Sequence, residues 1–176
     1  MSDVIEIRGS GKAPPAKGKR DAAPAEVSLG TLPSHIGFAL RLAQIAVFQD
    51  FHRAVADLDL RPGQYSVLLT LCANPGIRAS QVAEALGIKR TNFVPLLDGL
   101  EARGLVARDR LERDRRAFAL FLTEDGAALL AHAEAAVARH EQRLTLALGE
   151  AGKPVLLELL ARLTATARDT PSPHRE

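Results

Sequence analysis

The sequence predicts a mainly α-helical fold: a winged helix-turn-helix with a two-stranded β-wing, joined to a helical dimerisation bundle. Apolar residues recur at steps of three and four through most of residues 32–168, which is the period of amphipathic helices. This pattern is interrupted between Gly104 and Gly126, where two short β-type runs flank an arginine-dense loop. Two helices joined by a glycine turn come before the interruption, so the order is helix, turn, helix, strand, loop, strand.

The first two predicted helices are separated at a proline. The first helix spans about residues 32–59 and begins at Pro33-Ser34. Its apolar residues have helical spacing: Ile36, Leu40, Ala43, Val47, Phe51, Val55 and Leu58. It ends before Pro62, because the residue that precedes a proline disfavours the α region. Pro62 opens the second helix, where its missing N–H has no cost, and the breaker sequence at 73–76 ends that helix.

The helix-turn-helix is predicted next along the chain. A short helix over 79–86 ends at Gly87, and a longer helix follows over 89–103. Two strands are expected on either side of a polar loop: 105–107 and 117–122, flanking 108–116. Because two strands alone are marginally stable, this hairpin is expected to lie against the helices.

Two further helices complete the predicted fold. Thr123 is a suitable N-cap, with acidic residues in the first turn, for a helix that reaches Gly149; a last helix follows Pro154. The first, fifth and sixth helices carry long apolar stripes with little sheet to cover them. An intersubunit helical bundle, and therefore a homodimer, is expected to bury these stripes. The chain then divides into a disordered tail, a two-part dimerisation region, a winged helix-turn-helix domain and a flexible C-terminus: 1–31, 32–60 with 124–168, 61–123 and 169–176.

Composition limits the classes of function. The 176-residue chain is 47% hydrophobic and has a net charge of only +2, so any electrostatic attraction to nucleic acid has to be local. Residues 89–116 hold eight Lys/Arg against five Asp/Glu, which is a net of +3. Cys72 is the only cysteine, which excludes an intrachain disulfide framework and a cysteine zinc cluster. The sequence lacks an apolar run of about 20 residues and a hydrophobic signal region, so a cytoplasmic protein with no membrane contact is expected.

Several short motifs occur in a fixed order. They are Leu60-Arg61-Pro62-x-Gln64, Ala83-x-x-Leu86-Gly87-Ile88, Leu100-Glu101-x-Arg103-Gly104-Leu105-Val106-x-Arg108, Asp114-Arg115-Arg116 and Leu122-Thr123-Glu124-x-Gly126. In order and spacing, over about residues 32–168, the chain resembles the MarR family of winged helix-turn-helix regulators. The resemblance implies a triangular homodimer, a palindromic operator, and a small ligand or oxidant that weakens DNA binding. Pro95, inside the expected recognition helix, departs from the family's pattern, because it removes a backbone donor and can tilt the first turn.

The start of the helix over 89–103 carries side chains suited to DNA. A recognition helix places its N-terminal side chains against base edges in the major groove, where Arg suits guanine and Asn suits adenine. The available residues are Lys89, Arg90, Thr91 and Asn92. The inward face of the helix is expected to consist of Phe93, Val94, Leu96, Leu97 and Leu100. The alternative for the polar residues is a solvated helix end.

The expected wing loop is rich in arginine. An arginine at a hairpin tip can enter the minor groove, where the negative potential is enhanced. The resemblance implies that Asp114 positions the wing through Arg116 while Arg113 or Arg115 reaches DNA. Acidic residues among these arginines would repel phosphates, so some are expected to be paired internally. The alternative is a salt-bridged hairpin that does not touch nucleic acid.

Two helix faces are candidates for an effector pocket. Their residues fall at steps of three and four, so the members of each set share a face. They are Arg41, Ile45, Phe48 and His52 on the first helix, and Tyr65, Leu69 and Cys72 on the second. If the faces meet, they form an apolar slot with a few polar groups, suited to an anionic or phenolic aromatic compound. The run at 40–51 also resembles MarR members that answer to aromatic acids or their coenzyme A thioesters.

Other roles compete for the same residues. Phe48, Tyr65 and Leu69 are alternatively core residues, and Cys72 is either an oxidation-sensing thiol or a buried small hydrophobe. His132 and His140 are too far apart in sequence to share a metal ion, so neither a metal nor a cofactor is expected. The basic residues of the tail either touch DNA phosphates or are solvated.

These patterns favour a ligand-responsive transcriptional repressor. A thiol-based redox-sensing repressor and a winged-helix protein-interaction module are the alternatives. The sequence shows no triad signature, paired-carboxylate motif or phosphate-binding loop, so an enzyme is not expected.

Overall fold

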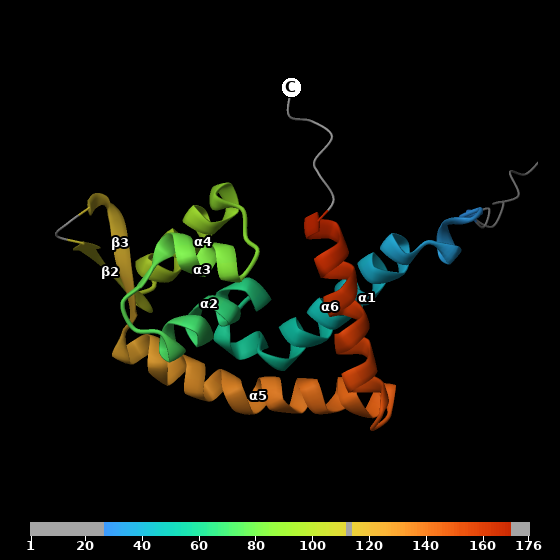
Figure 1. Cartoon of the computed structure of the whole chain (residues 1–176). Coiled ribbons are helices and arrows are strands. Elements are labelled where there is room, and N and C mark those ends of the chain that lie inside the picture. Colours follow the sequence, from blue (N-terminus) through green and yellow to red (C-terminus); the bar gives the residue numbers. More distant parts are fainter. Residues whose placement is uncertain (1–26, 112–113, 170–176) are drawn as a thin grey trace, which may run out of the picture.

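The computed structural model describes residues 27–111 and 114–169. Long helices build most of this part of the chain, and a small antiparallel sheet lies at one end (Figure 1). α5 runs along one side of the molecule, from the base of the sheet to α6 (Figure 1). In chain order the helices are α1 (Ile36–Ala54), α2 (Pro62–Ala73), α3 (Ala79–Ala85), α4 (Arg90–Ala102), α5 (Glu124–Leu148) and α6 (Gly152–Asp169). Residues 1–26 and 170–176, which include most of the predicted tail and C-terminus, lie outside the described residues.

The first predicted helix is divided in the structure. The sequence predicts one helix over 32–59, whereas the chain forms a 3-10 turn at Leu32–Ser34, then α1, then a second 3-10 turn at Ala56–Leu58. Asp59 follows in the left-handed region, with φ of 44°, and the chain turns there toward α2. Apolar spacing did not predict this break, because a 3-10 turn nearly preserves the spacing of an α-helix.

The wing differs from its prediction in length and in strand number. Its strands are β2 (Val106–Leu111) and β3 (Asp114–Leu122), so most of the predicted loop at 108–116 is paired backbone. A third strand, β1 (Ile77–Arg78), pairs antiparallel with β3 and gives the order β1-β3-β2. The ladder extends beyond the apolar runs because backbone hydrogen bonds form without a buried face in a projecting hairpin. β1 has two residues, too few to give an alternating pattern.

The core joins the predicted dimerisation region to the helix-turn-helix. Its fully buried side chains come from α2, α3, α4 and β3: Val67, Leu68, Leu71, Val82, Leu100 and Leu120. Phe51 of α1 and Leu130 and Ala133 of α5 pack into the same cluster. Burying a leucine of this kind contributes about 1.5–3 kcal/mol. The two predicted regions therefore share one hydrophobic core within the chain.

A tight corner connects the base of the wing to α5. Thr123 is the N-cap of α5, as predicted, and its Oγ1 accepts a hydrogen bond from the Gly126 amide at 3.0 Å. The same hydroxyl donates to the Gly104 carbonyl at 2.7 Å. Gly126 is buried against the Leu105 carbonyl, at a place where a Cβ would lie 2.1 Å from the carbonyl oxygen. The first turn of α5 therefore requires glycine at this position.

The far end of the molecule leaves apolar side chains exposed. α6 packs on α5 and lies away from the sheet (Figure 1). The exposed large hydrophobic residues on α1, the end of α5 and α6 include Ile36, Leu40, Leu42, Leu146, Val155, Leu157, Leu159 and Leu163. Leu146 is 74% exposed. No helix in the described part of the chain is long and apolar enough to cross a membrane.

Candidate nucleic-acid interface and effector site

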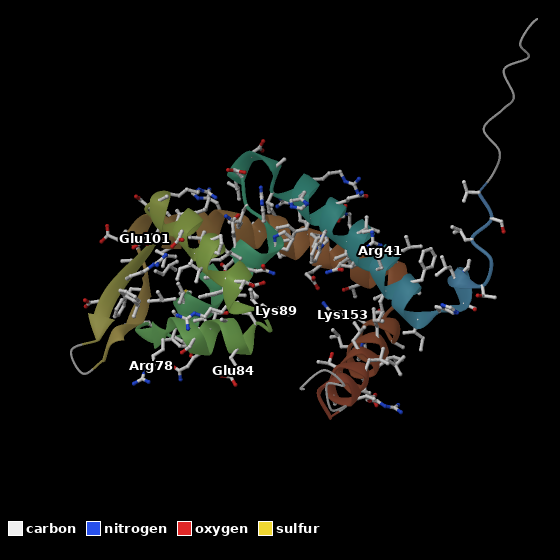
Figure 2. The ribbon with its side chains drawn as sticks, turned by 90° about the horizontal axis from the view of Figure 1, so that it is seen from above. Arg41, Arg78, Glu84, Lys89, Glu101 and Lys153 are labelled. Atoms are coloured by element: carbon white, nitrogen blue, oxygen red, sulfur yellow. The ribbon has the colours of Figure 1, made fainter. Side chains whose placement is uncertain are left out.

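The polar start of α4 faces solvent. Lys89 is the N-cap, and Arg90, Thr91 and Asn92 form an exposed first turn. Lys89 lies at the end of α4 nearer α6, and Glu101 lies at the end next to the wing (Figure 2). Helical geometry turns the polar start outward, because the buried residues Phe93, Leu97 and Leu100 hold the opposite face against the core. The four predicted DNA-contacting residues are therefore all accessible.

Two apolar residues on α4 differ from their expected placement or effect. Val94 is 44% exposed, so the prediction that it belongs to the inward face is wrong. At about 100° per residue, Val94 is turned well away from the direction of Phe93 and toward the wing side. Pro95 is the sixth residue of α4 and is exposed, and the helix continues through it to Ala102. Pro95 has no N–H to donate to the Thr91 carbonyl, yet it does not end the helix.

Arg108 fixes the wing to α4. This residue of β2 pairs with Asp98, and its Nε lies 2.9 Å from Oε2 of Glu101. The Arg108 side chain is only 20% exposed. The acidic residues that it pairs with belong to α4; pairing of the wing's own acidic residues stays a prediction, because the side chains of Glu112 and Asp114 lie outside the described part. The ion pairs set the wing against the recognition helix and neutralise the negative charge of Asp98 beside the DNA-facing turn.

Arg103, the C-cap of α4, fixes the same C-terminal end of this helix to the corner before α2. Its Nη1 donates to the Asp59 carbonyl at 2.7 Å, and its Nη2 donates to the Leu58 carbonyl at 3.1 Å. The motif that contains Arg103 does not indicate this contact. Its two acceptors are backbone atoms more than 40 residues away in sequence, so no side-chain pattern could have revealed the contact.

A pocket of about 640 Å³ lies between the recognition helix and the wing. It carries three arginines from three elements: Arg78, Arg90 and Arg108. Apolar side chains complete its wall, including Ile88, Phe93 and Leu97. Arg78 and Glu84 lie along the α3 edge of this lobe (Figure 2). Arg108 is paired with Asp98 and Glu101, so Arg78 and Arg90 are the cations of this pocket that can attract an anionic backbone.

The predicted wing contacts are only partly described. Arg113 lies outside the described residues. Asp114, Arg115 and Arg116 are the first residues of β3, and their side chains also lie outside the described part. Their backbone is in the hairpin that Arg108 holds against α4.

The predicted effector residues are mostly on the surface. Arg41, Phe48 and His52 of α1 and Leu69 and Cys72 of α2 are exposed. Phe48 is 41% exposed and Leu69 is 42% exposed, so the alternative that these two are core residues is wrong. Cys72 is exposed, so its interpretation as a buried small hydrophobe is also wrong. The buried face of α2 is fixed by Val67, Leu68 and Leu71, and Cys72 is turned about 100° from Leu71.

Tyr65 is the predicted effector residue that reaches the core. It is half-buried, and the centroid of its ring lies 5.8 Å from the centroid of the Phe51 ring. Burial raises the pKa of the Tyr65 hydroxyl, and the negative charges of Glu134 and Glu141 raise it further. Phe51 also contacts His140 of α5 edge to face, with ring centroids 5.8 Å apart. The structure therefore joins α1, α2 and α5 in one aromatic cluster: Phe51, Tyr65 and His140.

Asp50 connects this cluster to the α5 surface. Its Oδ2 accepts from Nδ1 of the buried His140 at 2.6 Å and from Nη2 of Arg143 at 2.8 Å. Oδ1 accepts from Arg53 at 3.3 Å. The His140 and Arg143 hydrogen bonds hold the pKa of Asp50 well below its usual range, against the opposing effect of desolvation. Sequence reasoning missed the cluster, because Asp50 and His140 are 90 residues apart.

Comparison with known proteins identifies the chain. A model of the MarR family matches residues 57–117. A protein of Thauera aromatica named as a transcriptional regulatory protein for the hcr operon is 36% identical over 153 residues, which cover 86% of this chain and 92% of that protein. The chain belongs to the MarR family. It is therefore a member of a family of transcriptional regulators, as the sequence motifs implied.

Two solved structures of the repressor CouR resemble this MarR-family chain over nearly the whole of their length. CouR bound to a 23-mer DNA duplex is 48% identical, with a TM-score of 0.73, and the match covers 80% of this chain and 99% of CouR. CouR bound to p-coumaroyl-CoA is 46% identical, with a TM-score of 0.74, and the match covers 82% of this chain and 100% of CouR. The winged helix-turn-helix prediction is thereby confirmed as the fold of this MarR-family protein.

The hydrogen bonds of Asp50 to His140 and Arg143 predict how the stability of this MarR-family protein depends on pH. The folded-state pKa of Asp50 lies below the unfolded value of about 3.9, so its ionised form contributes stability above that value. That contribution is lost as the pH falls through the folded-state pKa. Asp50→Asn is expected to lower the unfolding free energy at pH 7, and the difference from wild type should shrink progressively below about pH 4.

Urea denaturation between pH 3 and pH 8 measures this difference. Asp57→Asn on η2, the 3-10 turn at Ala56–Leu58, is the matched control, because Asp57 is exposed and belongs to none of the ion pairs recorded among the described residues. It should change stability little at any pH. An Asp50→Asn deficit that persists unchanged at pH 3 would show that the hydrogen bonds do not act through the carboxylate charge.

Proposed function

We propose that this chain is a repressor that binds a palindromic operator as a homodimer and is released by an aromatic acyl-CoA thioester. The observation that carries the proposal is its identity of nearly one half to CouR, over almost all of CouR, in structures with DNA and with p-coumaroyl-CoA. A free aromatic acid is the second effector class, favoured by the likeness to the PcaV regulator bound to its natural ligand, at 27% identity.

The DNA contact is proposed for α4 and the wing. The exposed first turn of α4 carries Lys89, Arg90, Thr91 and Asn92, whose side chains suit base edges and phosphates. Arg113, Arg115 and Arg116 are proposed to reach the minor groove from the wing, with Asp114 holding the hairpin. Arg108 supports this assignment, because its ion pairs to α4 fix the distance between the two DNA-contacting elements.

The dimer is proposed to form through α1, α6 and the end of α5. Large apolar side chains on all three helices are exposed in the single chain, which is what a surface covered by a second copy would show. Burial in an intersubunit bundle would also place two copies of α4 on one face, as a palindromic operator requires.

The effector is proposed to bind where α1 meets α2. Exposed Phe48 and Leu69 offer apolar contact, and the half-buried Tyr65 offers a hydroxyl that can donate or accept a hydrogen bond. Arg41 and His52 are positioned on α1 for anionic groups of the effector. A ligand at this place would contact α1, which belongs to the proposed dimer surface. It would also contact α2, whose buried face packs against the helix-turn-helix. It can therefore change the separation of the two α4 helices.

The proposal is tested by fluorescence anisotropy with an operator duplex selected by the protein from random DNA. p-Coumaroyl-CoA is expected to weaken binding by about 5- to 150-fold, the usual range of coupling between two sites. Free p-coumarate and coenzyme A alone distinguish the acid from the thioester. Phe48→Ala should lower the response, and Arg139→Ala, at an exposed position on α5, should leave it intact. Failure of a panel of aromatic acids and acyl-CoA thioesters to weaken binding would contradict the effector class.

Peroxide sensing by Cys72 is the second candidate function. The exposed position of its thiol allows oxidants to reach it. Loss of operator binding on treatment with an organic hydroperoxide, abolished in Cys72→Ser, would favour this mechanism over release by an acyl-CoA thioester.

A further inference from the structure

We propose that Pro95 contacts the 5-methyl group of a thymine in the operator and is a specificity-determining residue of α4. This inference rests on the proposed function, since it requires α4 to enter the major groove. It assigns to this proline a role in sequence recognition that is separate from the hydrogen bonds proposed for the first turn of α4.

Pro95 occupies the centre of the solvent face of α4. Phe93, Leu97 and Leu100 mark the buried face. Pro95 is two residues from Phe93 and two from Leu97, so at about 100° per residue it points close to the opposite direction. It is exposed and lies one turn after Thr91 on the same side of the helix. As the sixth residue of the helix it remains within the first two turns, where recognition helices contact base edges.

The chemistry of proline restricts what it can recognise. Its ring presents only CH₂ groups and its nitrogen carries no hydrogen, so it can neither donate to nor accept from a base edge. Among base edges in the major groove, only thymine presents an apolar group, the 5-methyl. A purine or cytosine edge opposite Pro95 would lose water from its polar atoms without gaining a hydrogen bond. Thymine is therefore the base that Pro95 favours.

The surroundings leave Pro95 free to approach the floor of the groove. Asp98, the acidic residue one turn later, is paired with Arg108, so its charge is partly neutralised toward DNA. Gly99 and Ala102, the next residues on this side, are small. The proline ring has almost no rotamer freedom to lose on docking, unlike a longer apolar side chain. A proline inside a helix removes one backbone hydrogen bond, yet α4 extends unbroken from Arg90 to Ala102.

The contact is tested with a matched change in protein and DNA. The wild-type protein first selects an operator from random duplexes, and each thymine of the half-site is then replaced by deoxyuridine, which lacks only the methyl group. Replacing one particular thymine, at the equivalent place in both half-sites, is expected to weaken wild-type binding by about fourfold per half-site. This factor corresponds to the burial of one methyl-sized group. Pro95→Ala should bind the thymine duplex more weakly by a similar factor and show almost no further loss with deoxyuridine at that place.

Arg90→Ala is the matched control. It is expected to bind the operator more weakly but to keep the full deoxyuridine penalty, because the methyl contact does not depend on Arg90. Alanine favours the helix more than proline does, so circular dichroism should show an intact fold for Pro95→Ala. A wild-type operator with no deoxyuridine-sensitive thymine, or a penalty that Pro95→Ala retains in full, would overturn the Pro95 assignment. Absence of any selected DNA sequence would instead overturn the proposed function.

Discussion

Gly126→Ala is expected to destabilise the protein by about 3 kcal/mol or more, beyond the usual cost of an overpacked side chain. The added Cβ would lie 2.1 Å from the Leu105 carbonyl oxygen and 2.8 Å from a methyl group of Leu122. The oxygen belongs to the backbone and already accepts from the Thr123 amide at 3.2 Å, so it cannot move without breaking the corner at the base of the wing. Soluble yield and thermal unfolding by circular dichroism measure the effect.

Gly99→Ala is the control for this substitution. It also adds a methyl group to a glycine inside a helix, but nothing lies within 4 Å of the new Cβ. Its stability should match or slightly exceed that of wild type, because alanine favours the helix by up to about 1 kcal/mol. A Gly126→Ala protein that melts within two or three degrees of wild type would show that the first turn of α5 can shift away from β2.

Arg90→Ala and Arg115→Ala are expected to weaken operator binding in two different ways. Arg90 is at the exposed start of α4, where a base contact is worth about 1–3 kcal/mol. Its loss should relax the preference for one base pair in each half-site. Arg115 is the second residue of β3, and its loss should weaken binding to all sequences alike while lowering the salt slope by about one for each lost phosphate contact.

Titrations against operator, single-base variants and unrelated DNA at several salt concentrations separate the two effects. Arg139→Ala is the charge-matched control, since Arg139 is exposed on α5 away from α4 and the wing. It should leave both the base preference and the salt slope unchanged. Equal loss on every sequence for Arg90→Ala would exclude base recognition by that residue, and an unchanged salt slope for Arg115→Ala would exclude a phosphate contact from the wing.

Local sequence signals predicted the elements of this fold well. The N-cap at Thr123, the helix start at Pro62 and the helix-turn-helix over 79–103 are all present, because each depends on residues close together in the chain. The break in the first helix and the strand β1 were missed. Both are short and leave the local hydrophobic period almost unchanged.

The contacts that position the candidate site were less predictable. Asp50 and His140, Arg103 and the Leu58 carbonyl, and Arg108 and Asp98 are joined by packing across different elements. The exposure of Cys72 likewise depends on which side of α2 the core covers. Single-sequence patterns define a helix face but not its neighbour, so they predicted which residues could bind an effector without showing whether those residues enclose a cavity.

Because α5 is long, a small tilt at one of its ends gives a large displacement at the other. This helix of 25 residues is about 37 Å long at 1.5 Å per residue, and it runs from α6 to the base of the wing (Figure 1). A tilt of about 5° at the α6 end therefore moves the wing end by about 3 Å over this length. That displacement nearly equals the rise of one base pair, about 3.4 Å. A tilt of α5 by this amount would therefore move each DNA-contacting lobe by nearly one base-pair rise.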